Sequence, residues 1–348
     1  MNHGLAFPDE IPTESALLEV LSEPSKSLIE QIGSISGPLV VVGAGGKMGP
    51  TLCVLAKRAA ELAGHSLSVM ALSRFSNEKE RSWLESRGVQ TRRFDALAES
   101  SGDPIPDASH VVYLVGLKFG TGDQPELTWA TNTLAPARVA QRYRGVPMVA
   151  LSTGNVYPMS EVDSQGSTES DPLTPLGEYA NAAVARERIF EYVSNQNQSP
   201  MALLRLNYAL DLRYGILVDL AQSLIKEQAI DLSMSAVNCL WQRDANERIL
   251  RSLALVEYPI AVYNLTSPEA YPIESLAMEL GERLGVAPRF VGSPARNALL
   301  SDASKLTRRL GRPETPIESV IRWTADWMGR GGRTLGRPTK FQVRDGVF

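Results

Sequence analysis

A glycine-rich turn between a buried strand and a helix constrains the fold of this chain more than any other feature. The segment VVVGAGGKMGPTL (40–52) passes from β-branched residues into glycines spaced three apart. Such a turn needs glycines, because the chain must turn tightly and its backbone must come close to a pyrophosphate. The helix that follows offers free amides and a partial positive charge to the phosphates. The motif predicts a dinucleotide site formed by Gly43, Gly46, Lys47, Met48 and Gly49.

Strand-like and helix-like segments alternate regularly along the first two thirds of the chain. Apolar, β-rich runs are expected to form buried strands at residues 38–46, 67–73, 89–94, 109–116, 146–154 and 200–207. Segments with helical spacing of apolar residues separate most of these runs. This alternation predicts an α/β fold with a doubly wound parallel sheet of the Rossmann type.

The same pattern divides the chain into parts. Residues 1–36 are expected to form an N-terminal helical extension, with helix starts at Thr13 and Ser25. Residues 37–207 form the predicted NAD(P)-binding Rossmann domain. Residues 208–328 form a smaller, mixed α/β region that is expected to bind the substrate.

The composition and the ends of the chain exclude several classes of protein. Lys plus Arg is 35 and Asp plus Glu is 39, so a net charge of −4 gives no general attraction to nucleic acid or membranes. No signal-peptide pattern and no apolar run of roughly 18 residues occurs, so a cytoplasmic protein is expected. The histidines lack metal-ligand spacing, and no metal site is predicted. The tail, 329–348, holds five Lys or Arg against one Asp, which favours a solvated tail over a strap across a partner subunit.

The end of the second strand indicates which dinucleotide is bound. An acidic residue there would bind the ribose hydroxyls of NAD, whereas an arginine accommodates the 2′-phosphate of NADP. The chain has Ser73 and Arg74, with no acid before Glu78. NADP is therefore favoured over NAD, and the alternative is that Arg74 is only a surface cation.

Several motifs, in a fixed order, resemble the NAD-dependent epimerase/dehydratase family of the extended short-chain dehydrogenase/reductase superfamily. YLVGLKFG (113–120) is similar to the AGLK stretch of UDP-galactose 4-epimerases, and LSTGNVYP (151–158) is similar to SS..VYG. LLRLNYAL (203–210) is similar to LRPFNVYGP. The resemblance runs from about residue 38 to 328. It implies an NAD(P) cofactor and a homodimer formed through two helices, one of which carries the catalytic tyrosine.

The resemblance also implies roles for single residues. Tyr179 and Thr153 stand at the catalytic tyrosine and Ser/Thr positions, and Lys118 stands beside the cofactor. Asp95 would face the adenine, and Asn132 matches the asparagine that follows the fourth strand.

The catalytic lysine of the family is missing. It should follow Tyr179 by four residues, but that position is Ala183, and Arg186 is the first cation downstream. In the family this lysine holds the nicotinamide ribose and lowers the pKa of the tyrosine. Without a nearby cation a tyrosine keeps a pKa of about 10, and only about one part in a thousand is ionised at pH 7.

Three outcomes of this loss are open. Another cation replaces the lysine, for which we favour Lys118 over Arg186. Otherwise, neutral Tyr179 acts as an acid with Thr153 as its partner. In the third case, the cofactor is bound without turnover.

Polar side chains near the expected carboxyl ends of the strands point to the substrate. Arginines bind carboxylate or phosphate through paired donors, and tryptophan stacks on sugar faces. The candidate substrate-binding residues are Asn155, Arg205, Asn207, Arg213, Trp241 and Asp244. The structural alternatives are that Trp241 is a core residue, that Asp244 is a helix N-cap and that Arg213 is an ion-pair partner.

These features predict an NAD(P)-dependent oxidoreductase or epimerase that transfers hydride to or from a sugar-like or hydroxy-acid substrate. Tyr179 and Thr153 would act at the reacting oxygen, with Lys118 in support. The alternative is a non-catalytic NAD(P)-binding protein with a regulatory or redox-sensing role. A scaffold with an empty cleft is a third possibility.

Overall fold

The central feature of the fold is a seven-stranded parallel sheet, seen in a computed structural model that describes residues 7–35, 37–98, 105–118, 120 and 123–347. The strands lie in the order β12-β7-β5-β4-β1-β2-β3. Their bounds are β1 (Leu39–Val42), β2 (Val69–Ser73), β3 (Gln90–Arg93), β4 (His110–Tyr113), β5 (Met148–Thr153), β7 (Met201–Leu206) and β12 (Ala261–Leu265). The predicted α/β fold of the Rossmann type is confirmed.

The strand order reverses direction between β1 and β4. From β1 the chain builds outward through β2 to β3, and it then returns to place β4 on the other side of β1. Loops that leave the carboxyl ends of two such strands diverge and leave a crevice, which is where ligands bind in open α/β sheets.

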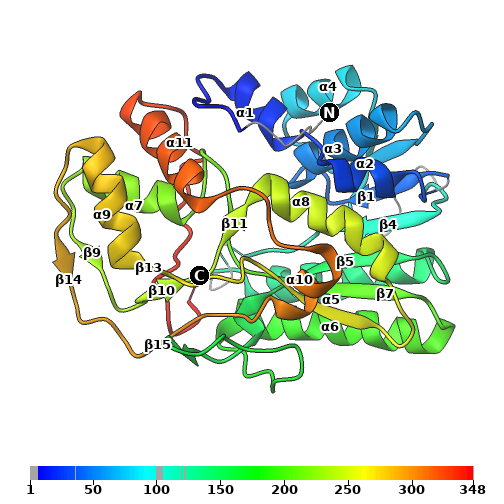
Figure 1. The fold of residues 1–348 in the computed structure, drawn as a ribbon. Helices are drawn as coiled ribbons and strands as arrows, with labels where there is room; N and C mark the ends of the chain where they lie inside the picture. The colour runs from blue at the N-terminus through cyan, green and yellow to red at the C-terminus, as the bar shows by residue number, and fades with distance from the viewer. Residues whose placement is uncertain (1–6, 36, 99–104, 119, 121–122, 348) are drawn as a thin grey trace.

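Helices cover both faces of the sheet (Figure 1). One face packs against α5 (Pro125–Arg142) and α6 (Gly177–Asn197). The other packs against α2 (Lys26–Ile32), α3 (Gly49–Leu62) and α8 (Gln242–Arg251). Each sheet face is thus buried, which explains why strands such as β1, LVVV, are apolar at every position.

The chain leaves the sheet after β7 and later returns to it. The segment AVYNLTS (261–267) holds β12, which pairs in parallel with β7 at the sheet edge, and α8 lies over α3. The sheet layer therefore includes elements from beyond residue 207. Other short elements of the sheet layer and its loops are α4 (Glu78–Ser86), η1 (Gly154–Val156), β6 (Ser160–Glu161), η2 (Ser252–Leu255) and α10 (Ser304–Leu310).

A second layer of helices and short strands lies beside the carboxyl ends of the sheet (Figure 1). Its core contains Trp241 and Trp323, whose ring centroids are 5.5 Å apart. The helices are α7 (Ile216–Ile225), α9 (Ile273–Leu284) and α11 (Ile317–Gly329). The strands are β8 (Ala209–Leu210), β9 (Ile230–Asp231), β10 (Ala236–Val237), β11 (Leu240–Trp241), β13 (Tyr271–Pro272), β14 (Phe290–Val291) and β15 (Asn297–Ala298).

The N-terminal extension is helical where the structure describes it; its residues 1–6 and 36 lie outside the described part. The predicted helix starts are the N-caps of α1 (Glu14–Leu21) and α2, because Thr13 Oγ1 accepts from Ala16 N and Ser25 Oγ accepts from Leu28 N. Ser25 Oγ also donates to Glu247 Oε1 at 2.6 Å, so the extension is tied to α8.

The C-terminal tail folds back over its own chain. We call residues 333–347 the strap. Leu335 N donates to Arg213 O at 2.8 Å, Thr339 is 1% exposed, and Phe341 packs in the second core. The favoured expectation of a solvated tail does not describe these residues, because the strap buries an aromatic ring.

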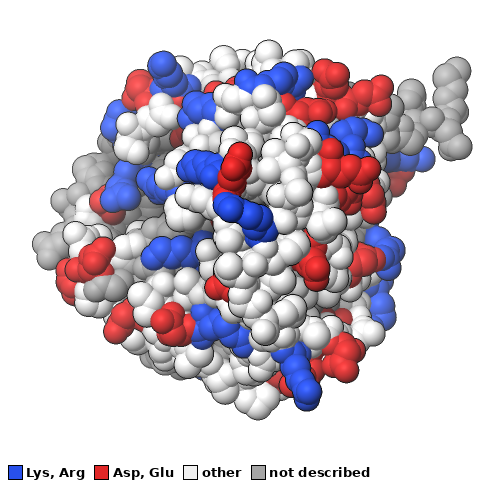
Figure 2. Space-filling view, turned by 90° about the vertical axis from the view of Figure 1, so that its left-hand side faces the viewer, with Lys and Arg blue, Asp and Glu red and all other residues white. Residues whose placement is uncertain are grey.

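Figure 2 shows basic and acidic side chains intermingled over one face of the molecule. None of the helices in the described ranges is long and apolar enough to cross a membrane.

Candidate active site

The glycine loop after β1 adopts a conformation that only glycine tolerates at two positions. Gly43 has φ +87°, and a Cβ there would lie 2.9 Å from Val115 N, in the loop after β4. A Cβ at Gly49 would collide with the backbone of Ala44, because α3 begins against the loop. The loop is therefore tight, and α3 packs close to the sheet.

The start of α3 can receive an anion. Leu52 N donates to Met48 O at 3.0 Å. At the start of α3 the N–H groups of Gly49 and Thr51 have no acceptor within the helix, and Pro50 between them has no N–H. Their N–H groups and the helix dipole point toward the loop. The tight loop and the open helix start fit the pyrophosphate of a dinucleotide.

A pocket of about 440 Å³ begins at this loop and extends along the carboxyl ends of the strands. Many of the predicted site residues line it: Gly43, Gly46, Lys47, Met48, Gly49, Lys118, Thr153, Asn155, Tyr179 and Asn207. They come from the loops after β1, β4, β5 and β7 and from α6. The structure thus brings the glycine loop and the predicted catalytic residues into one site.

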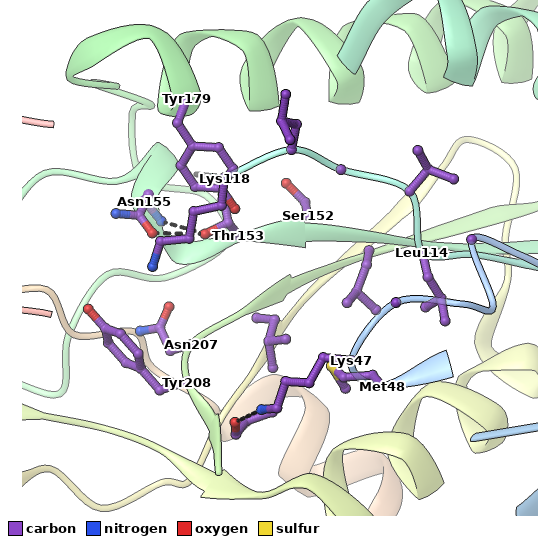
Figure 3. A pocket seen from close by; sticks show the side chains of 18 of the residues that line it. Lys47, Met48, Leu114, Lys118, Ser152, Thr153, Asn155, Tyr179, Asn207 and Tyr208 are labelled. Carbon is purple, nitrogen blue, oxygen red and sulfur yellow. Dashed lines mark hydrogen bonds between the residues drawn. The ribbon is translucent and has the colours of Figure 1, made fainter. Parts of the chain in front are cut away.

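Tyr179, Thr153 and Lys118 lie together in this pocket (Figure 3). Tyr179 points down from the first turn of α6 and is 9% exposed. Thr153 ends β5; its hydroxyl donates to Asn155 Oδ1 at 3.0 Å and accepts from Asn155 N at 3.2 Å. These two bonds fix the direction of the Thr153 hydroxyl.

Lys118 reaches the pocket from the loop after β4. Its Nζ donates to Thr339 O at 3.1 Å and lies 5.8 Å from the ring centroid of Tyr208. Burial lowers the pKa of Lys118 to about 8, although Asp219 opposes this effect; Lys340 adds to it. Lys118 is therefore still mainly a cation at pH 7.

Arg186 lines the pocket from behind the loop after β4. Its Nη1 donates to Asn132 Oδ1 at 2.8 Å and to Val115 O at 3.3 Å. A Cβ at Gly116 would lie 2.7 Å from this nitrogen, so the guanidinium packs directly against the loop after β4. Its contacts with Asn132 and with the backbone indicate a structural role for this cation.

Lys47, in the glycine loop, faces the second layer. Its Nζ donates to Ala209 O and lies 4.8 Å from the ring centroid of Tyr214. Burial lowers the pKa of Lys47 to about 8, and Asp211 opposes this effect. Lys47 thus joins the glycine loop to the segment after β7.

The model of one protein family, described as "NAD dependent epimerase/dehydratase family", matches residues 39–209. This stretch belongs to the NAD-dependent epimerase/dehydratase family. It holds the glycine loop, Lys118, Thr153 and Tyr179, and the family's lysine is replaced by Ala183. No curated protein sequence matches the chain.

Solved structures of sugar-nucleotide enzymes share the fold. One is a UDP-galactose 4-epimerase, 20% identical, with a TM-score of 0.66 over 84% of this chain and 99% of that chain. Another is the UDP-glucuronic acid 4-epimerase from Bacillus cereus with NAD, 16% identical, with a TM-score of 0.69 over 84% and 97%. A third is the dTDP-glucose 4,6-dehydratase from Bacillus anthracis with NAD, 15% identical, with a TM-score of 0.69 over 85% and 97%.

The residues predicted to select the dinucleotide lie beside the glycine loop, outside the pocket lining. Ser73 ends β2, and its Oγ would be 2.6 Å from a Cβ at Gly45. Arg74 follows and is exposed. Asp95, after β3, accepts from Leu97 N at 2.9 Å and so shapes its own turn.

The predicted substrate arginines form ion pairs and do not line the pocket. Arg205 is 4% exposed and binds both carboxylate oxygens of Glu187, at 3.0 and 2.7 Å. Arg213 binds Asp211, with Nη2 to Oδ2 at 2.6 Å. The ion-pair alternative for Arg213 is therefore the arrangement in the structure.

Trp241 and Asp244 also lie away from the pocket. Trp241 is 2% exposed in the second core, as the structural alternative expected. Asp244 is not an N-cap, since Trp241 caps α8; instead, its carboxylate binds Arg243 at 3.0 Å and accepts from Thr315 N at 2.9 Å.

Sequence reasoning missed the pocket residues Tyr208, Arg337 and Thr339. Tyr208 has φ +37° and turns its ring into the pocket beside Asn207 (Figure 3). Arg337 and Thr339 lie on the strap, whose Gly- and Arg-rich sequence has no periodic pattern that would place it.

Proposed function

We propose that the chain is an NAD(P)-dependent oxidoreductase or epimerase that acts on a sugar-like or hydroxy-acid substrate by hydride transfer. The observation that carries this proposal is the meeting of Tyr179, Thr153 and Lys118 in a pocket that begins at a dinucleotide-type glycine loop. Family membership and the sugar-nucleotide enzymes among the solved relatives support it.

Side chains of the pocket transfer the proton of the substrate hydroxyl. A bound nicotinamide would supply hydride transfer to or from the substrate carbon. Tyr179 takes a proton from the substrate hydroxyl or returns one to the carbonyl oxygen. Thr153 donates a hydrogen bond to the same oxygen after its hydroxyl turns away from Asn155 Oδ1. Lys118 supplies the positive charge that favours an ionised tyrosine, which is the role of the missing lysine. Asn155 N keeps the Thr153 oxygen in position, because it donates to that oxygen at 3.2 Å.

Turnover assays test this proposal. Sugar alcohols and sugar acids are screened with NAD and NADP, and reduced dinucleotide is followed by absorbance. Tyr179→Phe is expected to lower the rate by about 10²- to 10⁴-fold. Tyr192→Phe, on the exposed side of the same helix, is the matched control and should keep full activity.

The non-catalytic alternative makes a different prediction for the same samples. A redox sensor would bind NADH or NADPH, seen as a fluorescence change, but would show no Tyr179-dependent turnover with any substrate. An absence of dinucleotide binding would contradict both functions.

We also propose a cytoplasmic homodimer that pairs through α5 and α6. The exposed apolar side chains of Leu127 and Leu134 lie seven residues apart and so on one face of α5. Exposed apolar residues that cluster on one face favour association. Sedimentation of the wild type and of Leu134→Glu tests this, and a monomeric wild type would contradict it.

A further inference from the structure

The strap supplies part of the wall of the pocket. Arg337 and Thr339 both line the pocket. Thr339 is fixed by Asp219 of α7, whose Oδ2 accepts from Thr339 N at 2.8 Å and from its hydroxyl at 2.5 Å. Thr339 O in turn holds Lys118. The strap is thus an ordered part of the site.

Positive side chains exceed negative ones around this wall. Lys118 and Lys47 lie in the lining with Arg337, and Lys340 also influences Lys118. The nearby carboxylates are already engaged, since Asp211 binds Arg213 and Asp219 binds Thr339. Cations with few counter-charges in a concave site favour an anionic ligand.

Arg337 is the cation that remains available for such a ligand. It forms no hydrogen bond or ion pair with any residue that the structure describes, and it acts electrostatically on Tyr214. Lys47, by contrast, is held by Ala209 O near the glycine loop, and Lys118 is held by Thr339 O. A guanidinium can bind a carboxylate or a phosphate through two parallel hydrogen bonds.

The pocket also offers a polar group suited to a hydroxyl. Asn207 is 2% exposed and lines the pocket, and within the described chain its Oδ1 has no hydrogen-bond partner. Its amide nitrogen is engaged by Asn238 Oδ1 at 2.9 Å. A buried acceptor without a donor costs free energy. A substrate hydroxyl would satisfy this oxygen once the amide turns away from Gly154, against which the oxygen packs.

The size of the pocket restricts the ligand further. About 440 Å³ must hold the nicotinamide end of the cofactor as well as the substrate. Ligand pockets of roughly 300–1,000 Å³ each enclose one drug-sized molecule. The pocket therefore has room for a small substrate beside the nicotinamide end.

We propose that the pocket binds a small polyhydroxylated substrate that carries a carboxylate or phosphate, and that Arg337 binds this anionic group. The proposal rests on the proposed function, because it takes the pocket to be the substrate site. Arg337 is then a specificity residue, and Asn207 accepts a hydrogen bond from a substrate hydroxyl.

Thermal-shift titration with saturating NADPH tests this without relying on turnover. The probes are hexitols, the matching aldonates, the matching hexitol phosphates and UDP-glucose. Aldonates or hexitol phosphates should raise the melting temperature more than the uncharged hexitols. The two charged sets distinguish a carboxylate from a phosphate ligand.

Two variants test whether Arg337 binds the anionic group of the ligand. Arg337→Gln should weaken the charged probe by about 10- to 100-fold, which corresponds to a lost charge-assisted hydrogen bond. Its affinity for NADPH and for hexitols should stay unchanged. Arg333→Gln is the matched control, because Arg333 lies on the strap, pairs with Glu14 and does not line the pocket.

The outcomes separate this proposal from the proposed function. Equal shifts with charged and uncharged probes, no shift with any small acid, or tighter binding of UDP-glucose would overturn the small-anion assignment. If Arg337→Gln weakens NADPH instead, Arg337 serves the cofactor, and the proposal also fails. Failure of NADPH to bind the wild type would reject the proposed function itself.

Discussion

At the scale of single residues, the charge of Lys118 is expected to control how the reaction depends on pH. Burial sets the pKa of Lys118 to about 8, so the ammonium loses its proton as the pH rises through that value. Wild-type oxidation should therefore be level near neutrality and should decline above about pH 8, where this charge is lost. Lys118→Met should be slower at pH 7 by about 10²- to 10⁴-fold, with a rate that climbs toward pH 10, the ordinary tyrosine range.

Two variants test whether Lys118 is the replacing cation. Lys118→Arg keeps the charge and should recover part of the rate with a flat alkaline limb. Arg186→Met, whose guanidinium supports the loop after β4, should lower stability without producing the climbing profile. A wild-type pH profile in Lys118→Met would show that another group supplies the charge.

Arg74 is expected to decide between the dinucleotides. It is exposed at the end of β2, beside the glycine loop, where a 2′-phosphate would lie. Arg74→Ala should weaken NADPH by about 10-fold or more, which is the value of one charge-assisted contact, and should leave NADH unchanged. Fluorescence titration measures both, with Arg87→Ala as a surface control. Equal wild-type affinity for the two dinucleotides would refute this prediction.

At the scale of elements, one buried ion pair joins α6 to β5 and β7. Glu187, on α6, accepts from Arg205 of β7 and from Ser152, the residue before Thr153. Arg205→Met leaves the Glu187 carboxylate buried and uncompensated, which should lower the free energy of unfolding by about 3–5 kcal/mol. Arg188→Met, next along α6 and exposed, should change it by less than about 0.5 kcal/mol. Urea unfolding measures both, and equal losses would contradict the prediction.

Elements whose signals are local could be predicted from the sequence. Ser25 caps its own helix within three residues, and the glycine loop carries its strand and helix beside it, so both appear in short segments. The fate of Arg205 could not be foreseen. A motif arginine in a strand can bind substrate or a partner, and Glu187 is 18 residues away on another element. Trp241 presents the same ambiguity between stacking on a sugar and packing in a core.

At the scale of the whole molecule, the strap connects the C-terminus to both layers. Its Phe341 completes the second core, and its Thr339 reaches the pocket. Long-range docking of this kind leaves no periodic trace in a Gly- and Arg-rich segment, because it depends on one apolar anchor and a few polar contacts. The place of the strap in the pocket wall could therefore not be predicted from the sequence.

The bond between Asp219 and Thr339 should hold the strap in place. Thr339→Val removes the hydroxyl that donates to Asp219, so a buried carboxylate loses a partner, and the free energy of unfolding should fall by about 1–3 kcal/mol. Trypsin should also cut faster at the Lys and Arg residues of the strap, since local opening becomes easier. Thr334→Val is the matched control, because its hydroxyl accepts only a 3.5 Å bond from Gln222.

The loss of stability in Thr339→Val is also expected to depend on pH. Burial raises the pKa of Asp219, and the bonds from Thr339 oppose this effect, so Thr339→Val should raise it further. A carboxyl whose folded pKa is raised above its unfolded value destabilises the fold as the pH rises through that pKa. The loss caused by Thr339→Val should therefore be largest at neutral pH and should shrink in acid, where Asp219 is protonated in both folded and unfolded chains. A loss that stays constant from neutral to acid pH would mean that Thr339 contributes by packing alone and not by holding the Asp219 charge.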